Sequence, residues 1–216
     1  MLDVFLAAFV TFFVIIDPPG VAPMFATLTQ DMDAAFRRKM AIKSVAVATG
    51  VLFAFAFGGA WLLDKLHVSL DAFRIAGGAL LFLIAVDMLF EKQTERREAR
   101  NEKVLEDRRA HPGEHDDISV FPLAIPLISG PGAIASIILY FTTHTDALNR
   151  AAVLAGAGAN LALTLAAFLV AGPLTRLMGK TVANMITRIF GILLAALAAQ
   201  FVVDGLRGAF ALNTAG

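Results

Sequence analysis

Two proline-glycine motifs constrain the fold of this chain more than any other feature, because each interrupts an otherwise apolar segment. They read Asp17-Pro18-Pro19-Gly20 and Ser129-Gly130-Pro131-Gly132, and Pro19 and Pro131 lie 112 positions apart. Proline removes a backbone donor and clashes with the preceding helical turn, while an adjacent glycine permits non-helical dihedral angles. We therefore expect both apolar segments to unwind near their middles, at Asp17 and at Ser129.

Long stretches without Asp, Glu, Lys or Arg indicate a membrane protein. Residues 45–63, 118–143 and 151–175 are such stretches, and 58% of the chain is hydrophobic. Each stretch is long enough to cross the roughly 30 Å hydrocarbon core of a bilayer as a helix. The pattern predicts an all-α membrane protein in contact with the lipid bilayer. Its six transmembrane segments cover roughly residues 3–28, 43–63, 70–90, 118–142, 151–172 and 184–206.

The third and sixth predicted segments resemble each other, which indicates an internal repeat. They open on Arg74-Ile75-Ala76-Gly77 and on Arg188-Ile189-Phe190-Gly191. Arg74 and Arg188 lie 114 positions apart, close to the 112 positions between the two proline-glycine motifs. We therefore predict a three-helix repeat over 1–90 and a second over 118–216. Residues 91–117 form a charged linker between them. An odd number of helices per copy inverts the second copy in the membrane, as in many secondary transporters.

The distribution of lysine and arginine predicts the orientation of the chain. The connections after the first, third and fifth segments hold 14 of these residues, and the opposite side holds 4. Positive residues concentrate on the cytoplasmic side of membrane proteins. Both termini are therefore predicted outside the cytoplasm, and the linker 91–117 inside it.

The two interrupted segments predict a substrate site where they meet near the middle of the membrane. A broken helix exposes free N–H groups at one half-helix end and free carbonyl groups at the other. Together these suit the carboxylate and ammonium groups of a small amino acid. The predicted contacts come from both motifs and the residues that follow them: Asp17, Pro18, Pro19, Gly20, Val21, Ser129, Gly130, Pro131, Gly132 and Ala133.

Asp17 is the residue whose position needs most explanation, because a carboxylate deep in a membrane is costly and usually faces a pathway. It could contact a substrate ammonium, bind Na⁺ or carry a proton, or its side chain could cap the second half-helix. Asn160 and Thr164 are also polar at depth, and we interpret them either as pathway residues or as hydrogen bonds between helices. We expect Asp87, near a helix end, to be solvated or paired with a basic loop.

Several classes of function find no support in the sequence. The chain has no cysteine and its formal net charge is zero, so nothing indicates thiolate metal sites or nucleic-acid binding. No His pair with metal-ligand spacing lies in an apolar segment, and no nucleophile motif of the Gly-x-Ser-x-Gly type occurs. We therefore predict neither an enzyme nor a resident cofactor, with coupling to Na⁺ or H⁺ left open.

The chain resembles the MarC family of bacterial inner-membrane proteins over almost its whole length. The stretches that carry this resemblance are 16–23, 74–78, 122–134 and 200–205. The resemblance implies six helices in an inverted repeat and similarity to transporters of small neutral amino acids such as glycine and alanine. It also implies a multi-pass protein of the bacterial inner membrane, so the termini predicted outside the cytoplasm would be periplasmic.

Three other functions compete with amino-acid transport. The first is export of another small metabolite or of a drug, and the second is a non-transporting membrane scaffold whose linker recruits a partner. A channel is the third, although one intramembrane carboxylate makes a poor selectivity ring unless the chain forms a homo-oligomer. The sequence leaves open the oligomeric state, the direction of transport and the coupling ion.

Overall fold

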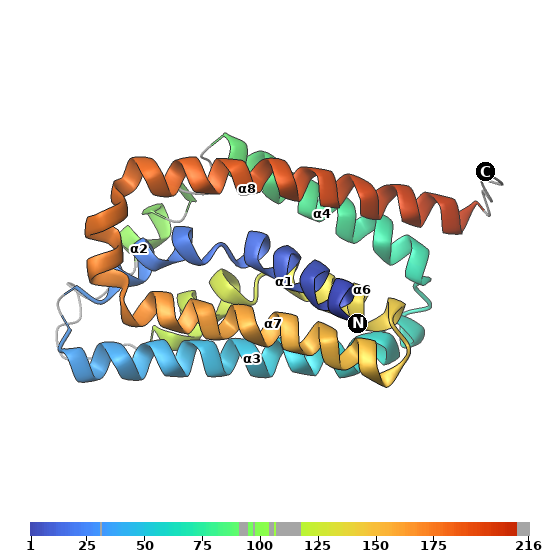
Figure 1. Ribbon diagram of the computed structural model, residues 1–216, viewed down its shortest axis with the longest axis horizontal. Coiled ribbons are helices and arrows are strands. Elements are labelled where there is room, and N and C mark those ends of the chain that lie inside the picture. The colour runs from blue at the N-terminus through green and yellow to red at the C-terminus, as the bar shows by residue number, and fades with distance from the viewer. Residues whose placement is uncertain (31, 91–94, 97, 104–105, 107–117, 211–216) are drawn as a thin grey trace.

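The computed structural model is a bundle of helices, and no strand occurs among the residues it describes. Those residues are 1–30, 32–90, 95–96, 98–103, 106 and 118–210. The helices are α1 (Leu2–Ile16), α2 (Pro18–Leu28), α3 (Ala34–Lys65), α4 (Leu70–Leu89), the π-helix η1 (Ser119–Ile128), α6 (Pro131–Thr143), α7 (Ala147–Leu169) and α8 (Ala171–Ala209) (Figure 1). Most of the predicted linker, including His111 and His115, lies outside the described residues.

Five helical segments are long and apolar enough to cross a membrane, and a bent pair of helices makes a sixth candidate. α1 and α2 count together as one span, Leu2–Leu28, and the pair of η1 and α6 is bent by 57°. The prediction of an all-helical, multi-pass membrane protein is confirmed.

Two helices extend well beyond the spans predicted for them. α3 starts at Ala34 because the Asp33 side chain accepts a hydrogen bond from the Phe36 N–H, 2.7 Å away, and so caps the helix in front of the basic residues. α8 starts at Ala171, but Gly179 has φ 66° and leaves the helical conformation. The part of α8 long and apolar enough to cross a membrane is Thr181–Ala209, close to the predicted segment.

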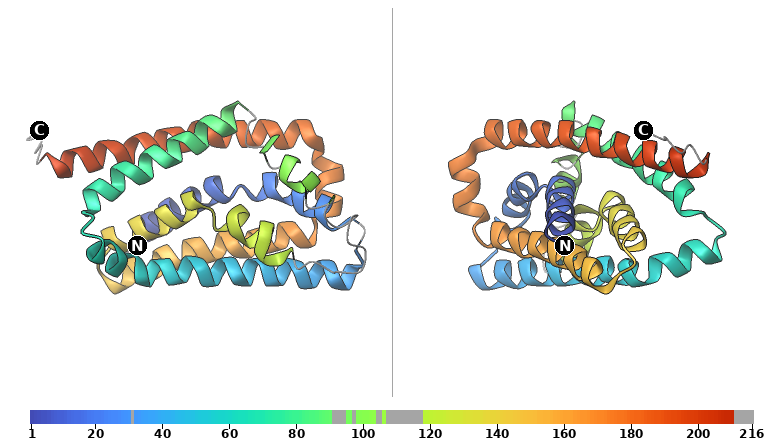
Figure 2. Two further views of the ribbon diagram at one scale, coloured as in Figure 1. Left: turned by 180° about the vertical axis from the view of Figure 1, so that it is seen from behind. Right: turned by 45° about the vertical axis from the view of Figure 1, so that its right-hand side comes forward.

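The bundle has three layers. α4 and α8 form one outer layer and α3 and α7 the other, while α1, α2, η1 and α6 run between them (Figures 1 and 2). α1 begins and α8 ends at the same end of the bundle, and the described residues between 95 and 103 lie at the other end. The chain therefore crosses the bundle an even number of times.

Glycines allow close contacts between helices, both within an outer layer and between an outer layer and the middle one. A Cβ at Gly78 would lie 2.8 Å from the Ala198 carbonyl oxygen, so α4 and α8 touch through their backbones. A Cβ at Gly156 of α7 would lie 2.9 Å from the carbonyl oxygen of Phe5 in α1. Small residues at such positions are how membrane helices pack without a hydrophobic driving force between them.

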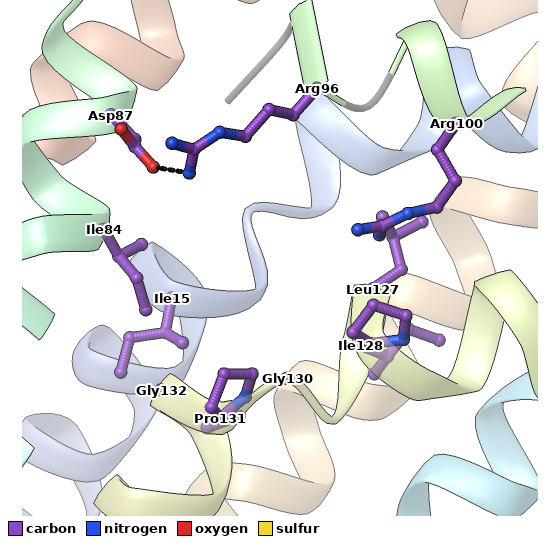
Figure 3. A pocket seen from close by; sticks show the side chains of 12 residues that line it. Ile15, Ile84, Asp87, Arg96, Arg100, Leu127, Ile128, Gly130, Pro131 and Gly132 are labelled. Atoms are coloured by element: carbon purple, nitrogen blue, oxygen red, sulfur yellow. Dashed lines mark hydrogen bonds and ion pairs between the residues drawn. The ribbon is translucent and has the colours of Figure 1, made fainter. Parts of the chain in front are cut away.

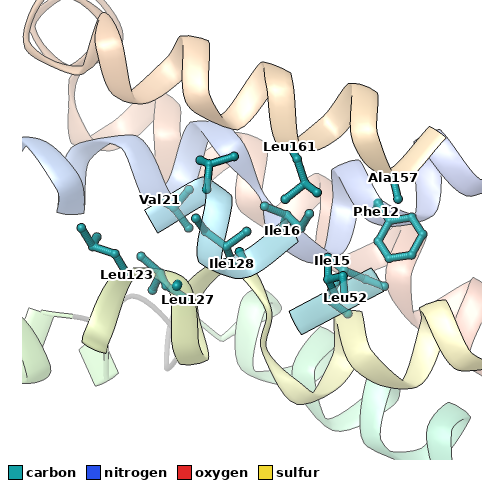
Figure 4. Packing of buried hydrophobic residues seen from close by; sticks show 14 of the residues in the cluster. Phe12, Ile15, Ile16, Val21, Leu52, Leu123, Leu127, Ile128, Ala157 and Leu161 are labelled. Atoms are coloured by element: carbon teal, nitrogen blue, oxygen red, sulfur yellow. The ribbon is translucent and has the colours of Figure 1, made fainter. Parts of the chain in front are cut away.

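Apolar side chains from the middle layer and from both outer layers form the core. They surround the junction between α1 and α2 on one side and the end of η1 on the other (Figure 4). Buried members include Phe12, Ile15, Ile16, Val21, Leu52, Leu123, Leu127, Ile128, Ala157 and Leu161. The core therefore packs against both proline-glycine motifs.

Candidate functional site

The first motif forms the junction between α1 and α2. α1 ends at Ile16, and Asp17 adopts the left-handed conformation with φ 53° and ψ 62°, which is uncommon for a residue other than glycine. α2 then begins at Pro18, a position where the missing N–H of proline does no harm. The Asp17 Oδ1 accepts a hydrogen bond from the Gly20 N–H, 3.1 Å away. Asp17 thus caps α2.

The Asp17 carboxylate also reaches the last helix of the chain. Its Oδ2 accepts a hydrogen bond from the Thr187 hydroxyl of α8, 3.0 Å away, and both side chains are buried. A Cβ at Gly20 would lie 2.0 Å from that oxygen, so only glycine leaves room for this position of the carboxylate. Thr187 was not among the residues predicted for the site, although it stands directly before the matched opening at Arg188.

The second motif forms the junction between η1 and α6. Phe121 and Ile125 have extended dihedral angles, as expected for residues that precede prolines. The Ser129 hydroxyl donates a hydrogen bond to the Ala124 carbonyl, 2.8 Å away, and so satisfies a backbone group of the irregular segment. α6 begins with Pro131, directly after this junction.

A cavity of about 230 Å³ opens beside the start of α6. The end of η1, the end of α1, α4 and the linker residues that the structure describes all contribute to its wall (Figure 3). Its lining residues are Ile15, Ile84, Asp87, Arg96, Arg100, Pro126, Leu127, Ile128, Gly130, Pro131, Gly132 and Ala133.

The two junctions are neighbours, but only one of them lines this cavity. A Cβ at Gly132 would lie 3.4 Å from Cγ2 of Ile15, which stands two positions before Asp17. Of the predicted contacts, Gly130, Pro131, Gly132 and Ala133 line the cavity, and Ser129 is buried beside them. Residues 17–21 do not line it, because Asp17 faces α8 and Pro18 and Val21 are buried.

Charged side chains occupy the linker side of the cavity. Arg96 forms an ion pair with Asp87 at the end of α4, which agrees with the expectation that Asp87 pairs with a basic segment. The Arg100 side chain also lines the cavity, next to Leu127 and Ile128 in Figure 3, and it forms no ion pair with any described residue. No feature of the sequence indicated that either arginine would meet the second motif.

Asn160 and Thr164 lie in α7 and are fully buried. The Asn160 Nδ2 donates to the Phe9 carbonyl of α1, 2.6 Å away, and the Thr164 hydroxyl donates to the Asn160 carbonyl, 2.8 Å away. Neither residue lines the cavity at α6. The Asn160 Oδ1 finds no hydrogen-bond partner among the described residues. Asn160 therefore ties α7 to α1, as the interpretation of a hydrogen bond between helices expected, whereas the bond of Thr164 lies within α7.

A second cavity, of about 260 Å³, lies at the opposite ends of α4 and α6. Its charged residues are Arg74 of α4 and Asp204 of α8. The Arg74 Nη1 donates a hydrogen bond to the Asp71 carboxylate, 3.0 Å away, and its Nη2 donates to the Thr143 hydroxyl, 3.1 Å away. The remaining lining residues are Leu139, Tyr140, Thr143, His144 and Phe201. No group of three or more His, Asp and Glu side chains is placed to hold a metal ion within the described part of the chain.

Comparison with known proteins identifies relatives along the whole chain. The family model described as MarC family integral membrane protein matches residues 2–210. The chain is similar to a UPF0056 membrane protein of Archaeoglobus fulgidus, with 37% identity over 95% of this chain and 93% of that protein. It is also similar to YvbG of Bacillus subtilis, with 34% identity over 95% of each chain.

A third relative, YhcE of Escherichia coli, is 34% identical over 96% of this chain and 94% of that protein. YvbG and YhcE are likewise described as UPF0056 membrane proteins. No solved structure matches the chain significantly. These descriptions establish membrane proteins of one kind, and they name no substrate.

Proposed function

Because the chain belongs to the MarC family of integral membrane proteins, we propose that it is a secondary transporter of small neutral amino acids, of the glycine and alanine class. In this proposal the substrate binds where the two interrupted spans meet, and the two halves of the chain alternate its exposure between the two sides of the membrane. The observation that carries the proposal is the small cavity at the start of α6, whose wall is mostly apolar and carries charged side chains on its linker side.

The chemistry of this cavity suits a small carboxylate-containing solute. The first N–H groups of a helix have no acceptor within the helix and carry partial positive charge, and Gly132 and Ala133 in the first turn of α6 line the cavity. Pockets that hold drug-sized ligands measure about 300 Å³ or more. The cavity, at about 230 Å³, is smaller and therefore favours a metabolite of a few heavy atoms over a drug.

The pattern of helix neighbours supports an inverted repeat. If the second copy matches the first, then α1 corresponds to η1, α2 to α6, α3 to α7 and α4 to α8. The contacts of α1 and α2 with α7 then have counterparts in the contacts of η1 and α6 with α3. The contact of α2 with α8 likewise corresponds to that of α6 with α4, and α4 also packs against its own counterpart α8.

Two cavities at opposite ends of the α4–α6 contact support alternating access. Between them Gly132 of α6 lies against Leu81 and Ile84 of α4. This apolar contact separates a cavity beside Asp87 from a cavity beside Arg74. We propose that movement of α4 against α6 opens one cavity to the substrate site as it closes the other. By the excess of positive charge, the cavity at Asp87 faces the cytoplasm and both termini are periplasmic.

Asp17 is our candidate for ion coupling. Its carboxylate joins the first half of the chain to α8 of the second half through Thr187. Binding of a proton or Na⁺ would change the charge at this joint, and an intramembrane carboxylate commonly serves this purpose. The capping bond from Gly20 fits the same proposal, because one carboxylate can cap α2 and respond to an ion.

Solute counterflow tests the function without knowledge of the coupling ion. Proteoliposomes loaded with unlabelled alanine are diluted into labelled alanine, and a carrier then accumulates label transiently above its equilibrium level. We expect this overshoot for the full chain and none for empty liposomes. A channel would equilibrate the label without overshoot, and a scaffold or a carrier for an unrelated drug would not take it up.

A further inference from the structure

We propose that the linker supplies the cation that binds the carboxylate of the substrate, and that this cation is Arg100. That the carboxylate belongs to an amino acid rests on the transport function proposed above. That the cavity at α6 binds a small carboxylate rests on the geometry of the cavity itself.

The linker enters the cavity through one helical face. The described residues 95–96 and 98–103 are helical. Arg96 and Arg100 are four positions apart, so they lie on the same side of a helix, and both line the cavity. The segment thus lies against the junction between η1 and α6. Its composition alone, with charges of both signs, is typical of a solvated helix.

The two arginines differ in what they leave available to a ligand. Arg96 is paired with Asp87, so the charge of one is offset by the other. Arg100 forms no ion pair with a described residue and lies half-buried. Its guanidinium is directed into the cavity (Figure 3). Among the described residues, the charged groups that line the cavity are Asp87, Arg96 and Arg100, two cations and one anion.

The surroundings of Arg100 strengthen its attraction for an anion. Leu127 and Ile128 form the wall beside it, and apolar walls reduce the screening of a charge by water. The start of α6, on the same cavity, adds N–H groups and the positive end of a helix. A guanidinium presents two parallel N–H donors that match the two oxygens of a carboxylate. The cavity therefore has the features of a carboxylate site.

Binding measurements on the purified full chain test this assignment. The ligands are alanine, propionate, alaninamide and inorganic phosphate. Propionate keeps the carboxylate without the ammonium, and alaninamide keeps the ammonium with an uncharged amide. The variants are Arg100→Gln, which removes the charge, and Arg100→Lys, which keeps it. Lys103→Gln is the matched control, because Lys103 is an exposed cation of the same segment and does not line the cavity.

We expect Arg100→Gln to weaken binding of alanine and propionate by roughly 10-fold to 100-fold, as for loss of a hydrogen bond to a charged group. Alaninamide binding should stay within about twofold, so the preference for alanine over alaninamide falls, a change that general loss of structure would not produce. Arg100→Lys should restore part of that preference, and Lys103→Gln should behave as the unaltered chain.

Three results would overturn the assignment. One is equal loss of alanine and alaninamide binding in Arg100→Gln, and the second is an unaltered preference in that variant. The third is an unaltered chain that binds phosphate but neither alanine nor propionate. If propionate binds through Arg100 while counterflow of alanine is absent, the carboxylate site stands and the amino-acid transport function fails. If counterflow is present and Arg100→Gln binds as the unaltered chain, the transport function stands and this assignment fails.

Discussion

The Thr187 hydroxyl donates a hydrogen bond to the Asp17 carboxylate across 170 positions of the sequence, with 3.0 Å between the two oxygens. The bond joins the junction between α1 and α2 to the middle of α8, and both side chains are buried. It is a direct polar link between the first interrupted span and the last span of the chain. Any motion that separates these two spans must break this hydrogen bond.

Replacing Thr187 by valine tests the strength of this link. Valine has nearly the same shape and lacks the hydroxyl, so one hydrogen bond to a buried charge is lost. We expect stability to fall by about 1.5–3 kcal/mol, the usual contribution of a hydrogen bond to a charged group. Unfolding in mixed micelles measures it. Thr187→Ser retains the donor and should lose less, and equal losses in both variants would show that packing, not the hydrogen bond, holds α8 here.

Gly20 is predicted to be indispensable for the position of Asp17. A Cβ at Gly20 would lie 2.0 Å from Oδ2 and 2.6 Å from Cγ of Asp17, so the carboxylate must leave its hydrogen bonds with Gly20 and Thr187. Alanine normally stabilises a helix relative to glycine by about 0.5–1 kcal/mol. We expect Gly20→Ala to lower the stability of the protein instead, and to reduce the uptake of substrate strongly.

The matched control for Gly20→Ala is Gly158→Ala in α7, where a Cβ would meet nothing within 4 Å. This variant should be as stable as the unaltered chain or more stable. Thermal denaturation of both variants provides the comparison. A Gly20→Ala variant as stable and active as Gly158→Ala would show that the carboxylate does not need its observed position.

The contact between α4 and α8 depends on Gly78. A Cβ there would lie 2.8 Å from the Ala198 carbonyl oxygen and 3.0 Å from the Val202 nitrogen, which are backbone atoms that cannot rotate away. Gly78→Ala should therefore push the two helices apart and reduce stability by about 1–3 kcal/mol, as overpacking generally does. Gly58→Ala in α3, where nothing lies within 4 Å, is the control. Equal denaturation midpoints would contradict the close approach of α4 and α8.

The sequence predicted the features that depend on local chemistry. Proline and glycine impose their backbone preferences wherever they stand, so α2 and α6 begin at Pro18 and Pro131, within the predicted motifs. A short acidic side chain before two prolines is a strong helix cap, and Asp17 acts as one. The uncharged stretches likewise predicted the spans, because length and hydropathy suffice for that inference.

The features that depend on long-range packing escaped prediction. Threonine is common in membrane helices, so nothing in the sequence distinguished Thr187 as the partner of Asp17. Glu, Arg and Lys are frequent throughout the linker sequence, and only docking decides that Arg96 and Arg100 face the cavity. Charged residues between 176 and 180 suggested a loop between the last two spans. In the structure α8 is helical before and after Gly179, and only that residue leaves the helical conformation.

The absence of cysteine permits a clean test of orientation. Lys103→Cys marks the linker, and Thr145→Cys marks the exposed connection between α6 and α7. A membrane-impermeant maleimide should label Thr145→Cys in cells whose outer membrane is permeable. It should label Lys103→Cys only after the inner membrane is opened. The reverse pattern would show that the orientation is inverted, and labelling of both from outside would contradict six membrane crossings.

Gradient-driven uptake of labelled glycine and alanine by proteoliposomes tests the central claim most directly, with Asp17→Asn beside the unaltered chain. Asparagine removes the charge at nearly the same size: its Oδ1 can accept from the Gly20 N–H, and its Nδ2 can donate to the Thr187 hydroxyl, which reverses the direction of that bond. The account predicts uptake driven by an imposed proton or Na⁺ gradient, and loss of that drive in Asp17→Asn. Failure of the folded, unaltered protein to take up either amino acid under any gradient would contradict it.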